Sequence, residues 1–289
     1  MTAAATKSRP GRAFGPVAGR ALLLHLWRRL ALLSAVGFLS GNALAQNPVN
    51  LDVPYVPTPQ QVVDRMLQIA GVKPTDLVMD IGCGDGRMVV TAAREYGARG
   101  FCNDIDPVRI AEARENAQRA GVTDKIEFRQ GNLFDVDLSQ ADVLPMYLLE
   151  TVNLKLRPKI LATAKPGARI VSHAFTMGDW KPDLSEAVDG RHIHLWIVPA
   201  RIDGRWQVRQ GPGQDSFDLR IKQAFQEFTG EATVKGRSLP VRDGRIRGTE
   251  ISFTYEPQPG QTRTFRGRVN GQAIEAIAGG GQGGLARRP

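Results

Sequence analysis

The spacing of apolar residues between positions 59 and 172 alternates between two kinds of segment. In one kind, apolar side chains recur every three or four residues, as in residues 59–70, which predicts amphipathic helices. In the other, short and mainly apolar runs are bounded by turn residues, which predicts buried strands. The predicted helices are 59–70, 88–96, 107–120 and 153–164, and the predicted strands are 77–79, 100–104, 125–128, 142–144 and 168–172. This alternation predicts an α/β fold, a parallel sheet with helices on both faces that binds ligands at the carboxyl ends of its strands.

The pattern changes after about Gly190, where short segments with alternating apolar residues follow one another without helices. These segments are 192–199, 206–208, 216–221, 232–234, 251–255 and 264–269. Asp203-Gly204, Asp243-Gly244 and Asn270-Gly271 are typical turn sequences between them. We therefore predict an antiparallel β meander that forms a small barrel or sandwich. The predicted divisions are an α/β domain at 46–200, a β domain at 201–276 and a disordered glycine-rich tail at 277–289.

The formal net charge of +9 would suggest a nucleic-acid partner if it were spread evenly over the chain. Residues 46–190, however, hold 16 basic and 20 acidic residues, whereas residues 191–289 hold 16 basic and 9 acidic ones. The aromatic residues that interleave with basic ones in RNA-binding platforms are absent. We therefore expect no nucleic-acid partner. The basic β domain either contacts an anionic surface such as a membrane or serves to stabilise and orient the α/β domain.

The first 45 residues have the organisation of a signal peptide. Six basic residues and no acidic one precede or flank an apolar run that begins after Arg28-Arg29, and Ala43-Leu44-Ala45 supplies a small-x-small cleavage pattern. The apolar run is shorter than the ~20 residues that span a bilayer. We predict a cleaved signal peptide and export to a bacterial periplasm, and an uncleaved membrane anchor is the alternative.

The most informative stretch, Asp80-Ile81-Gly82-Cys83-Gly84-Asp85-Gly86-Arg87, follows the first predicted strand. Glycines allow backbone to lie directly against a ligand. Their spacing is not the G-x-G-x-x-G that seats a pyrophosphate, and the carboxylates of Asp80 and Asp85 would repel one. A nucleotide-dependent oxidoreductase is therefore the disfavoured alternative, and a cationic ligand fits better. Asp104 ends the second predicted strand 22 positions after Gly82, where a carboxylate can accept both hydroxyls of a ribose. S-adenosylmethionine combines a sulfonium, an ammonium and a ribose without phosphate.

These residues, together with Asn103-Asp104-Ile105-Asp106-Pro107, resemble a class I S-adenosylmethionine-dependent methyltransferase over about residues 52–200. The resemblance implies a Rossmann-like sheet of seven strands, with Asp80 and Gly82 near the methionine part of the cofactor. It also implies contacts of Asp104 and Ile105 with the ribose side and of Asn132 and Leu133 with the adenine. Asn132 replaces the Asp that the family often has there. The cofactor-binding residues expected are Tyr55, Thr58, Asp80, Gly82, Gly84, Asp85, Gly86, Asp104, Ile105, Asn132 and Leu133.

A narrower resemblance rests on Val53-Pro54-Tyr55-Val56-Pro57-Thr58-Pro59 and on Phe175-Thr176-Met177-Gly178-Asp179-Trp180-Lys181-Pro182. Both segments are similar to the lysine methyltransferase group that includes the ATP synthase c-subunit enzymes. The resemblance implies a protein side chain such as lysine as the methyl acceptor. Tyr55 and Thr58 would cover the methionine end of the cofactor, and the alternative is that they are ordinary turn residues.

Methyl transfer from a sulfonium needs alignment more than a dedicated nucleophile, so catalytic residues leave little trace in a sequence. Tyr147 follows the fourth predicted strand and is a candidate to contact the acceptor; aromatic packing at the sheet edge is the alternative. His173 ends the fifth strand and is a candidate base, or a structural histidine. His192 and His194 alternate along a strand, and we expect no metal site. Cys83 and Cys102 are expected to be two buried thiols rather than a disulfide.

The sequence thus predicts an exported methyltransferase that uses S-adenosylmethionine and acts on a protein side chain. S-adenosylmethionine is made in the cytoplasm, which leaves a second hypothesis open. The chain would then be an exported ligand-binding module that keeps the methyltransferase fold without catalysis.

Overall fold

The computed structural model describes residues 53–209, 217–277 and 285–287. The segment interpreted as a signal peptide, residues 1–45, lies outside the described residues. Within them, no helix has the length and apolar character needed to cross a membrane.

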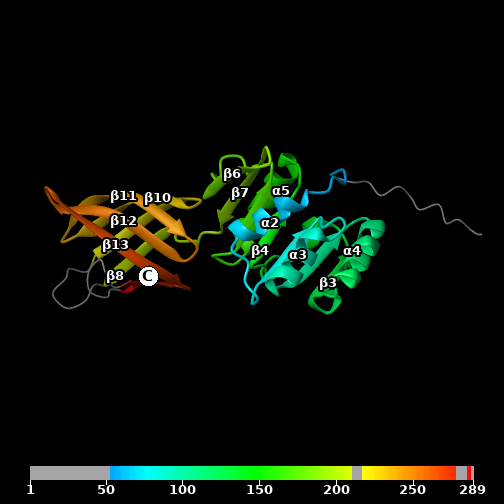
Figure 1. Cartoon of the computed structure of the whole chain (residues 1–289). Helices are drawn as coiled ribbons and strands as arrows, with labels where there is room; N and C mark the ends of the chain where they lie inside the picture. Colours follow the sequence, from blue (N-terminus) through cyan, green and yellow to red (C-terminus); the bar gives the residue numbers. More distant parts are fainter. Residues whose placement is uncertain (1–52, 210–216, 278–284, 288–289) are drawn as a thin grey trace, which may run out of the picture. The chain divides into compact units, whose positions relative to one another are not determined.

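Residues 60–197 form a seven-stranded sheet with helices on both faces, as predicted (Figure 1). The strand order is β3-β2-β1-β4-β5-β7-β6, with the first five strands parallel and β7 and β6 antiparallel. The strands are β1 (Leu77–Ile81), β2 (Arg99–Asp104), β3 (Ile126–Gln130), β4 (Val143–Met146), β5 (Arg169–His173), β6 (Leu184–Val188) and β7 (Arg191–Ile197). The helices are α2 (Gln60–Ile69), α3 (Arg87–Tyr96), α4 (Pro107–Arg119) and α5 (Glu150–Thr163), with 3-10 turns η1 (Thr123–Lys125) and η2 (Leu133–Asp135). The strand β6 was not predicted.

Alternate residues of the central strands enter two separate cores because successive side chains of a strand point to opposite faces. Val78 of β1 packs with the buried faces of α2, α3 and α4. Its neighbour Met79 packs with α5 on the other face, in a core that also holds Trp180 and Trp196. Both cores are closed by apolar side chains with almost no exposure, which fixes the positions of the strand ends that carry the site.

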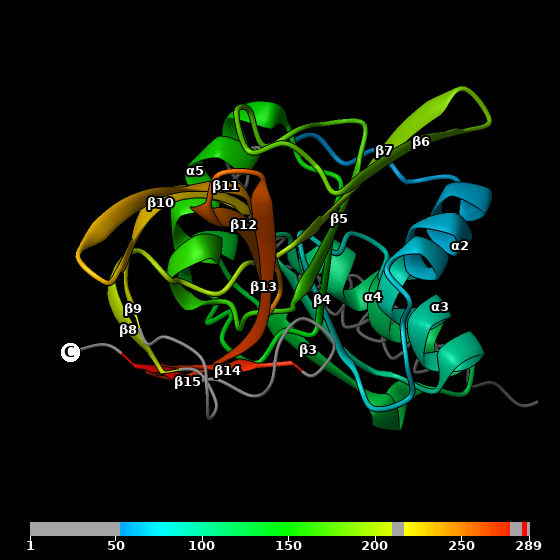
Figure 2. The same ribbon diagram turned by 90° about the vertical axis from the view of Figure 1, so that its left-hand side faces the viewer.

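The remaining described strands form a closed antiparallel barrel in the order β10-β11-β12-β13-β14-β15-β8-β9 (Figure 2). Of the two architectures predicted, barrel or sandwich, the structure has the barrel. They are β8 (Gly204–Arg209), β9 (Phe217–Ala224), β10 (Glu227–Val234), β11 (Arg237–Arg247), β12 (Glu250–Gln258), β13 (Gln261–Asn270), β14 (Ala273–Ala276) and β15 (Leu285–Arg287). Inward residues such as Trp206, Phe253 and Ile274 are at most 1% exposed and fill the interior.

Two expectations for this region need correction. Asp243-Gly244 is not a turn between strands but an irregularity inside β11, where the pairing register shifts. Asp243 has a φ of 55°, and a Cβ on Gly244 would lie 2.2 Å from the carbonyl oxygen of Phe228, so glycine is required by close backbone approach. In the tail predicted to be disordered, Leu285–Arg287 pairs with β14 and β8 as β15. Residues 278–284 and 288–289 lie outside the described residues.

Candidate active site

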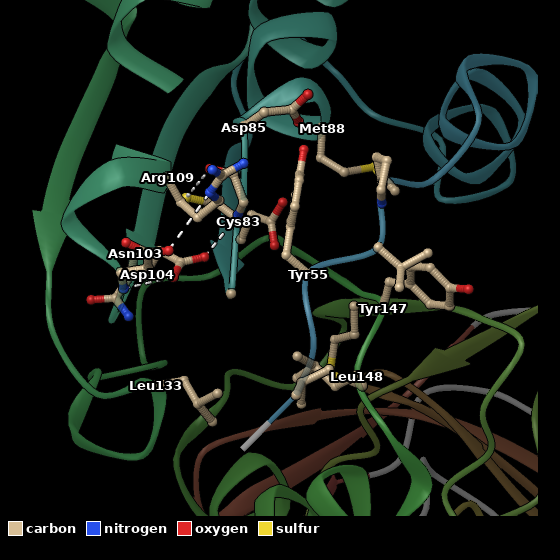
Figure 3. Close-up of a pocket in the computed structure, with 18 of the residues that line it drawn as sticks. Tyr55, Cys83, Asp85, Met88, Asn103, Asp104, Arg109, Leu133, Tyr147 and Leu148 are labelled. Atoms are coloured by element: carbon tan, nitrogen blue, oxygen red, sulfur yellow. Dashed lines mark hydrogen bonds and ion pairs between the residues drawn. The ribbon is translucent and has the colours of Figure 1, made fainter. Parts of the chain in front are cut away.

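A pocket lies at the carboxyl ends of β1, β2 and β4, the edge of the sheet that the topology predicts for a ligand (Figure 3). Eleven of the residues expected to form the site line this one pocket, although they come from segments up to 92 positions apart. These residues are Tyr55, Thr58, Asp80, Gly82, Gly84, Asp85, Asp104, Ile105, Asn132, Leu133 and Tyr147. Gly86 and His173, also expected, do not line it.

The glycine turn forms the wall of the pocket between β1 and α3. Gly82 and Gly84 have φ values of 122° and 53°, in the region that residues with a Cβ rarely adopt. The amides of Gly82 and Cys83 both donate to the carbonyl oxygen of Asn103 at 2.7 and 3.1 Å, which ties the turn to the end of β2. The turn is therefore held from below by the neighbouring strand while its upper backbone surface stays open to the pocket.

Asp80 supplies a buried carboxylate at the end of β1. Its side chain is 7% exposed on the pocket floor. Burial first, and then the nearby carboxylates of Asp104 and Asp85, raise its pKa to about 8 from the ordinary 3.8. A carboxyl group in such a place favours a cationic ligand, because a positive charge offsets both the burial and the like-charge repulsion.

Asp104 at the end of β2 is oriented by two backbone amides. Its Oδ2 accepts from Gly84 at 2.9 Å and its Oδ1 accepts from Asp106 at 3.0 Å. A carboxylate oxygen has two lone pairs, so both oxygens keep acceptor capacity towards the pocket. Asp106 does not share this role: it caps α4 by accepting from the amide of Val108 at 2.8 Å, as expected from its position before Pro107.

The far end of the pocket is lined by Asn132 and Leu133. Asn132 is the N-cap residue before η2, and its Oδ1 accepts from the amide of Phe134 at 2.9 Å, which leaves one lone pair and the amide NH2 for another partner. Asn103, which also lines the pocket, donates to the carbonyl oxygen of Gly131 at 2.9 Å, while its own Oδ1 is buried without a hydrogen-bond partner.

The segment 53–59 crosses the mouth of the pocket and is held at two points. Arg87 donates to the carbonyl oxygen of Thr58 at 2.6 Å, and the Thr58 hydroxyl is 3.2 Å from Nδ1 of His173. At the other point the guanidinium of Arg109 lies over the ring of Tyr55, with its carbon 4.4 Å from the ring centroid, an attractive cation–π geometry. Figure 3 shows Tyr55 reaching across the pocket towards Asp85 and Arg109.

Tyr147 lines the pocket on the side opposite Asp104 (Figure 3), and His173 lies against Tyr147 without lining the pocket itself. Their ring centroids are 3.9 Å apart and the rings are stacked, with Phe175 6.2 Å from Tyr147 on the same side. His173 is 2% exposed, and burial together with the charge of Arg191 lowers its pKa to about 4. Its imidazole is therefore neutral at physiological pH and is a poor proton acceptor. The low pKa argues against the role of general base and for a structural role beneath Tyr147.

Comparison with known proteins identifies the family. Residues 80–184 match the model of the ANTKMT methyltransferase domain. A protein-lysine N-methyltransferase of Saccharolobus islandicus is 45% identical over 151 residues, which make up 50% of this chain and 94% of that protein. The chain belongs to the class I S-adenosylmethionine-dependent methyltransferases.

Within this family it falls in the lysine methyltransferase group that the sequence motifs suggested. The mouse adenine nucleotide translocase lysine N-methyltransferase is 31% identical, over 54% of this chain and 73% of the mouse protein. A solved structure of an RNA methyltransferase from Salinibacter ruber in complex with S-adenosyl-L-homocysteine is 50% identical, with a TM-score of 0.50, over 51% of this chain and 96% of that chain. The matched family residues end at 184, before the barrel begins.

The pocket of this methyltransferase fits S-adenosylmethionine on the chemistry of its own residues. The buried carboxyl of Asp80 suits the cationic methionine end, and Asp104 presents acceptors for a ribose diol. The unpartnered Oδ1 of Asn103 offers a further acceptor. Both glycines that line the pocket place backbone where a Cβ would intrude on neighbouring side chains, 3.1 Å from Leu148 at Gly82 and 2.5 Å from Tyr55 at Gly84.

Gly86 serves the fold of the site rather than its lining. It lies at the start of α3 with a φ of 76°, and a Cβ there would be 2.8 Å from the Cβ of Ala113. Glycine therefore permits α3 and α4 to pack closely beneath the turn, and Gly86 does not line the pocket.

The expectation of two free thiols was wrong: Cys83 and Cys102 form a disulfide, with their Cα atoms 5.3 Å apart. The reason is the register of the sheet. β1 pairs with β2 so that Ile81 lies beside Asn103, and the turn then bends back over the strand end. The disulfide covalently joins the cofactor turn to the strand that carries Asp104.

Sequence reasoning missed Arg109, which lines the pocket and contacts Tyr55. One signal was available. Arg109 lies in the first turn of α4, where the helix dipole disfavours a positive charge. The acidic neighbours Asp106 and Glu112 offset this, with Arg109 Nη1 2.6 Å from the Glu112 carboxylate. The structure shows that Arg109 also has a partner outside its helix, the ring of Tyr55. Among the residues described, no group of three metal-binding side chains occurs.

Proposed function

We propose that this protein transfers the methyl group of S-adenosylmethionine to a lysine side chain of another protein. The observation that carries the proposal is the charge and shape of the pocket. Four carboxyl groups and two guanidiniums line it, and Tyr147, which stacks on His173, lines its acceptor side. An acidic pocket with an aromatic wall suits an amine better than an anionic acceptor. The names of the lysine methyltransferases that this chain resembles point the same way.

The residues of the chain act mainly by positioning and by excluding water. When bound, S-adenosylmethionine supplies a methyl group on a sulfonium, which an amine can displace in line. A lysine amine must first lose its proton, and a desolvated setting lowers the pKa of an ammonium. Tyr147 lies at the edge of the pocket, and the neutral imidazole of His173 stacks on its ring without adding a positive charge. Thr58 in turn holds His173 in place through its hydroxyl.

RNA is the rival acceptor, because the structure from Salinibacter ruber carries that name. Charge favours protein over RNA for this chain. Residues 46–190 contain more acidic than basic residues, and a polyanion would be repelled from the acidic mouth of the site. The basic residues that would attract RNA are concentrated in residues 191–289.

The experiment uses the protein, radiolabelled S-adenosylmethionine and a bacterial lysate depleted of small molecules. Protease treatment should release the label and ribonuclease should not, and mass spectrometry should locate it as methyl-lysine. Asp80→Ala is the variant expected to be inactive. Its matched control is Asp137→Ala, on an exposed turn outside the pocket, which should remain active. Label that ribonuclease releases would replace protein by RNA as the acceptor. Binding of S-adenosylmethionine without transfer to either would instead support the exported ligand-binding module.

We also propose that the protein works outside the cytoplasm. Residues 1–45 have the pattern of a signal peptide, and a structural disulfide suits an oxidising compartment. N-terminal sequencing of the protein from cell fractions tests this. A mature chain that begins near residue 46 in the periplasmic fraction would support export, and an intact N-terminus in the cytoplasm would contradict it.

A further inference from the structure

The loop between β5 and β6, residues 174–183, connects the acceptor side of the pocket with the barrel. Near its start, Phe175 packs against Tyr147 with ring centroids 6.2 Å apart. Its backbone there is fixed by Ser172, whose hydroxyl donates to the Phe175 carbonyl oxygen at 2.7 Å, and by Asn153, whose amide donates to that of Thr176 at 3.1 Å. The position of Phe175, and through it that of Tyr147, therefore depends on where this loop lies.

The later half of the loop is held by aromatic contacts. Trp180 is fully buried and its carbonyl oxygen accepts from Nε1 of Trp196 at 2.7 Å. Phe225, in the turn between β9 and β10 of the barrel, stacks on Trp180 with centroids 5.9 Å apart and ring planes 11° apart. The guanidinium of Arg157 lies 5.4 Å from the centroid of Phe225 and also donates to the carbonyl oxygen of Met177 at 2.7 Å. One barrel side chain thus packs against both the loop and the helix that supports the loop.

Gln226, the next residue of the same turn, adds a hydrogen bond. Its Nε2 donates to the carbonyl oxygen of Lys181 at 2.7 Å, and its side chain is buried at 7% exposure. Its own carbonyl oxygen accepts from the amide of Ile246 at 2.8 Å, which fixes the residue to β11. A buried amide that contacts a loop carbonyl at this distance specifies the position of the loop, since its loss would leave polar groups unpaired.

Phe225 makes its contact at a cost in backbone conformation. Its φ is 55°, in the left-handed region that favours Gly or Asn in two-residue hairpin turns. An aromatic residue there is strained by about 1 kcal/mol or more. The turn alone would be better served by glycine. The stacking of Phe225 on Trp180 supplies the reason for an aromatic residue at this position.

We propose that Phe225 and Gln226 are positioning residues through which the barrel fixes the β5–β6 loop, and with it the Phe175–Tyr147 contact on the acceptor side. This rests on the proposed function for its consequence in catalysis and on the contacts above for its structural part. The barrel would then take part in the reaction by positioning this loop, whether or not its basic surface binds a partner.

The test compares Phe225→Ala and Gln226→Ala with the conservative variant Phe225→Tyr. Lys235→Ala, at a left-handed position in the hairpin turn at the other end of β10, is the matched control. Hydrogen exchange of the full-length protein is expected to show protection of residues 174–183 falling at least tenfold in Phe225→Ala and Gln226→Ala only. Calorimetric titration should give a Kd for S-adenosylmethionine within twofold of wild type in all four variants.

Methyl transfer to poly-L-lysine supplies the catalytic measurement. Phe225→Ala and Gln226→Ala should each lower kcat/KM for poly-L-lysine about tenfold, with KM for S-adenosylmethionine unchanged. Phe225→Tyr should keep both constants at their wild-type values. Unchanged exchange in the loop, or an equal loss of cofactor affinity and acceptor turnover, would overturn the proposal. If wild type transfers no methyl group to lysine, the proposed function fails separately, and the exchange measurement still decides whether Phe225 and Gln226 hold the loop.

Discussion

The ring of Tyr55 rests directly on the backbone of Gly84: a Cβ on Gly84 would lie 2.5 Å from Cε2 of Tyr55. This contact joins the segment that crosses the pocket to the turn that forms its wall. A side chain at position 84 must therefore either displace the Tyr55 ring or enter the space of the cofactor. Gly84 also has a φ of 53°, so the turn itself disfavours any other residue.

We predict that Gly84→Ala weakens binding of S-adenosylmethionine at least tenfold, about 1.4 kcal/mol. The control is Gly121→Ala, whose φ is 69° but whose added Cβ would meet nothing within 4 Å. It carries the same backbone strain without the steric conflict and should leave the Kd within twofold. Calorimetric titration measures both. An equal loss in the two variants would mean that strain alone, and not the contact with Tyr55, makes glycine necessary.

Asp80 should make cofactor binding depend on pH. Its pKa of about 8 means that the carboxyl is mostly protonated at pH 7, and a cationic ligand favours the ionised form. Affinity for S-adenosylmethionine should therefore rise as pH increases from 6 towards 8, by up to about tenfold per unit. Above that, loss of the proton from the ligand's α-amino group opposes a further increase. Titrations in buffers of different ionisation enthalpy should reveal proton release, and Asp80→Asn should bind weakly with no such rise.

The same group should affect the stability of the ligand-free protein in the opposite direction. Between the ordinary carboxyl pKa of 3.8 and the folded value of about 8, the native state holds a proton that the unfolded state has released. Stability of the ligand-free protein then falls as pH rises through this window. We expect Asp80→Asn to raise Tm at pH 7.5 by several degrees and to have little effect at pH 4. A lower Tm for Asp80→Asn at pH 7.5 would contradict the raised pKa.

How far the sequence predicts this fold depends on whether a segment's pattern is set locally. The parallel strands and the glycine turn follow from short-range patterns, because β1 and β4 are buried on both faces and are mainly apolar. β6 carries no such signal, since its residues are exposed or half-buried at the sheet edge. β11 was missed because Asp243-Gly244 has the composition of a turn, and only the close approach of the Phe228 carbonyl makes it a bulge.

The site shows the same division. Asp80 and Asp104 could be predicted because strand ends of a parallel sheet meet at one edge. The disulfide between Cys83 and Cys102 could not, because it requires the register of β1 against β2 and the path of the turn above it. Phe225 was equally out of reach. Its partner Trp180 lies 45 positions earlier, and no local pattern announces a contact between two domains.

The disulfide should stabilise the fold and the cofactor turn. The two cysteines are 19 positions apart, and closing a loop of this size is expected to add about 3 kcal/mol to the free energy of unfolding. Reduction of the wild type should lower its urea midpoint accordingly and weaken cofactor binding, since Cys83 lies between the two pocket glycines. The double variant Cys83→Ser/Cys102→Ser should match the reduced protein and not respond to reducing agent. Equal midpoints for oxidised and reduced wild type would show that the disulfide contributes nothing to stability.

Tyr147 and His173 should separate acceptor chemistry from cofactor binding. Because the two rings stack at 3.9 Å outside the cofactor turn, Tyr147→Ala should lower transfer to a lysine substrate at least tenfold with a Kd for S-adenosylmethionine within twofold of wild type. Tyr147→Phe keeps the ring and should keep most of the activity if stacking and the π face are what matter. A loss in Tyr147→Phe as large as in Tyr147→Ala would assign the function to the hydroxyl instead. The pH dependence of the rate tests the role of His173. Because its pKa is about 4, His173 should produce no inflection in the rate of transfer between pH 5.5 and 8. An inflection near pH 6.5 that His173→Gln abolishes would instead show that His173 is the general base.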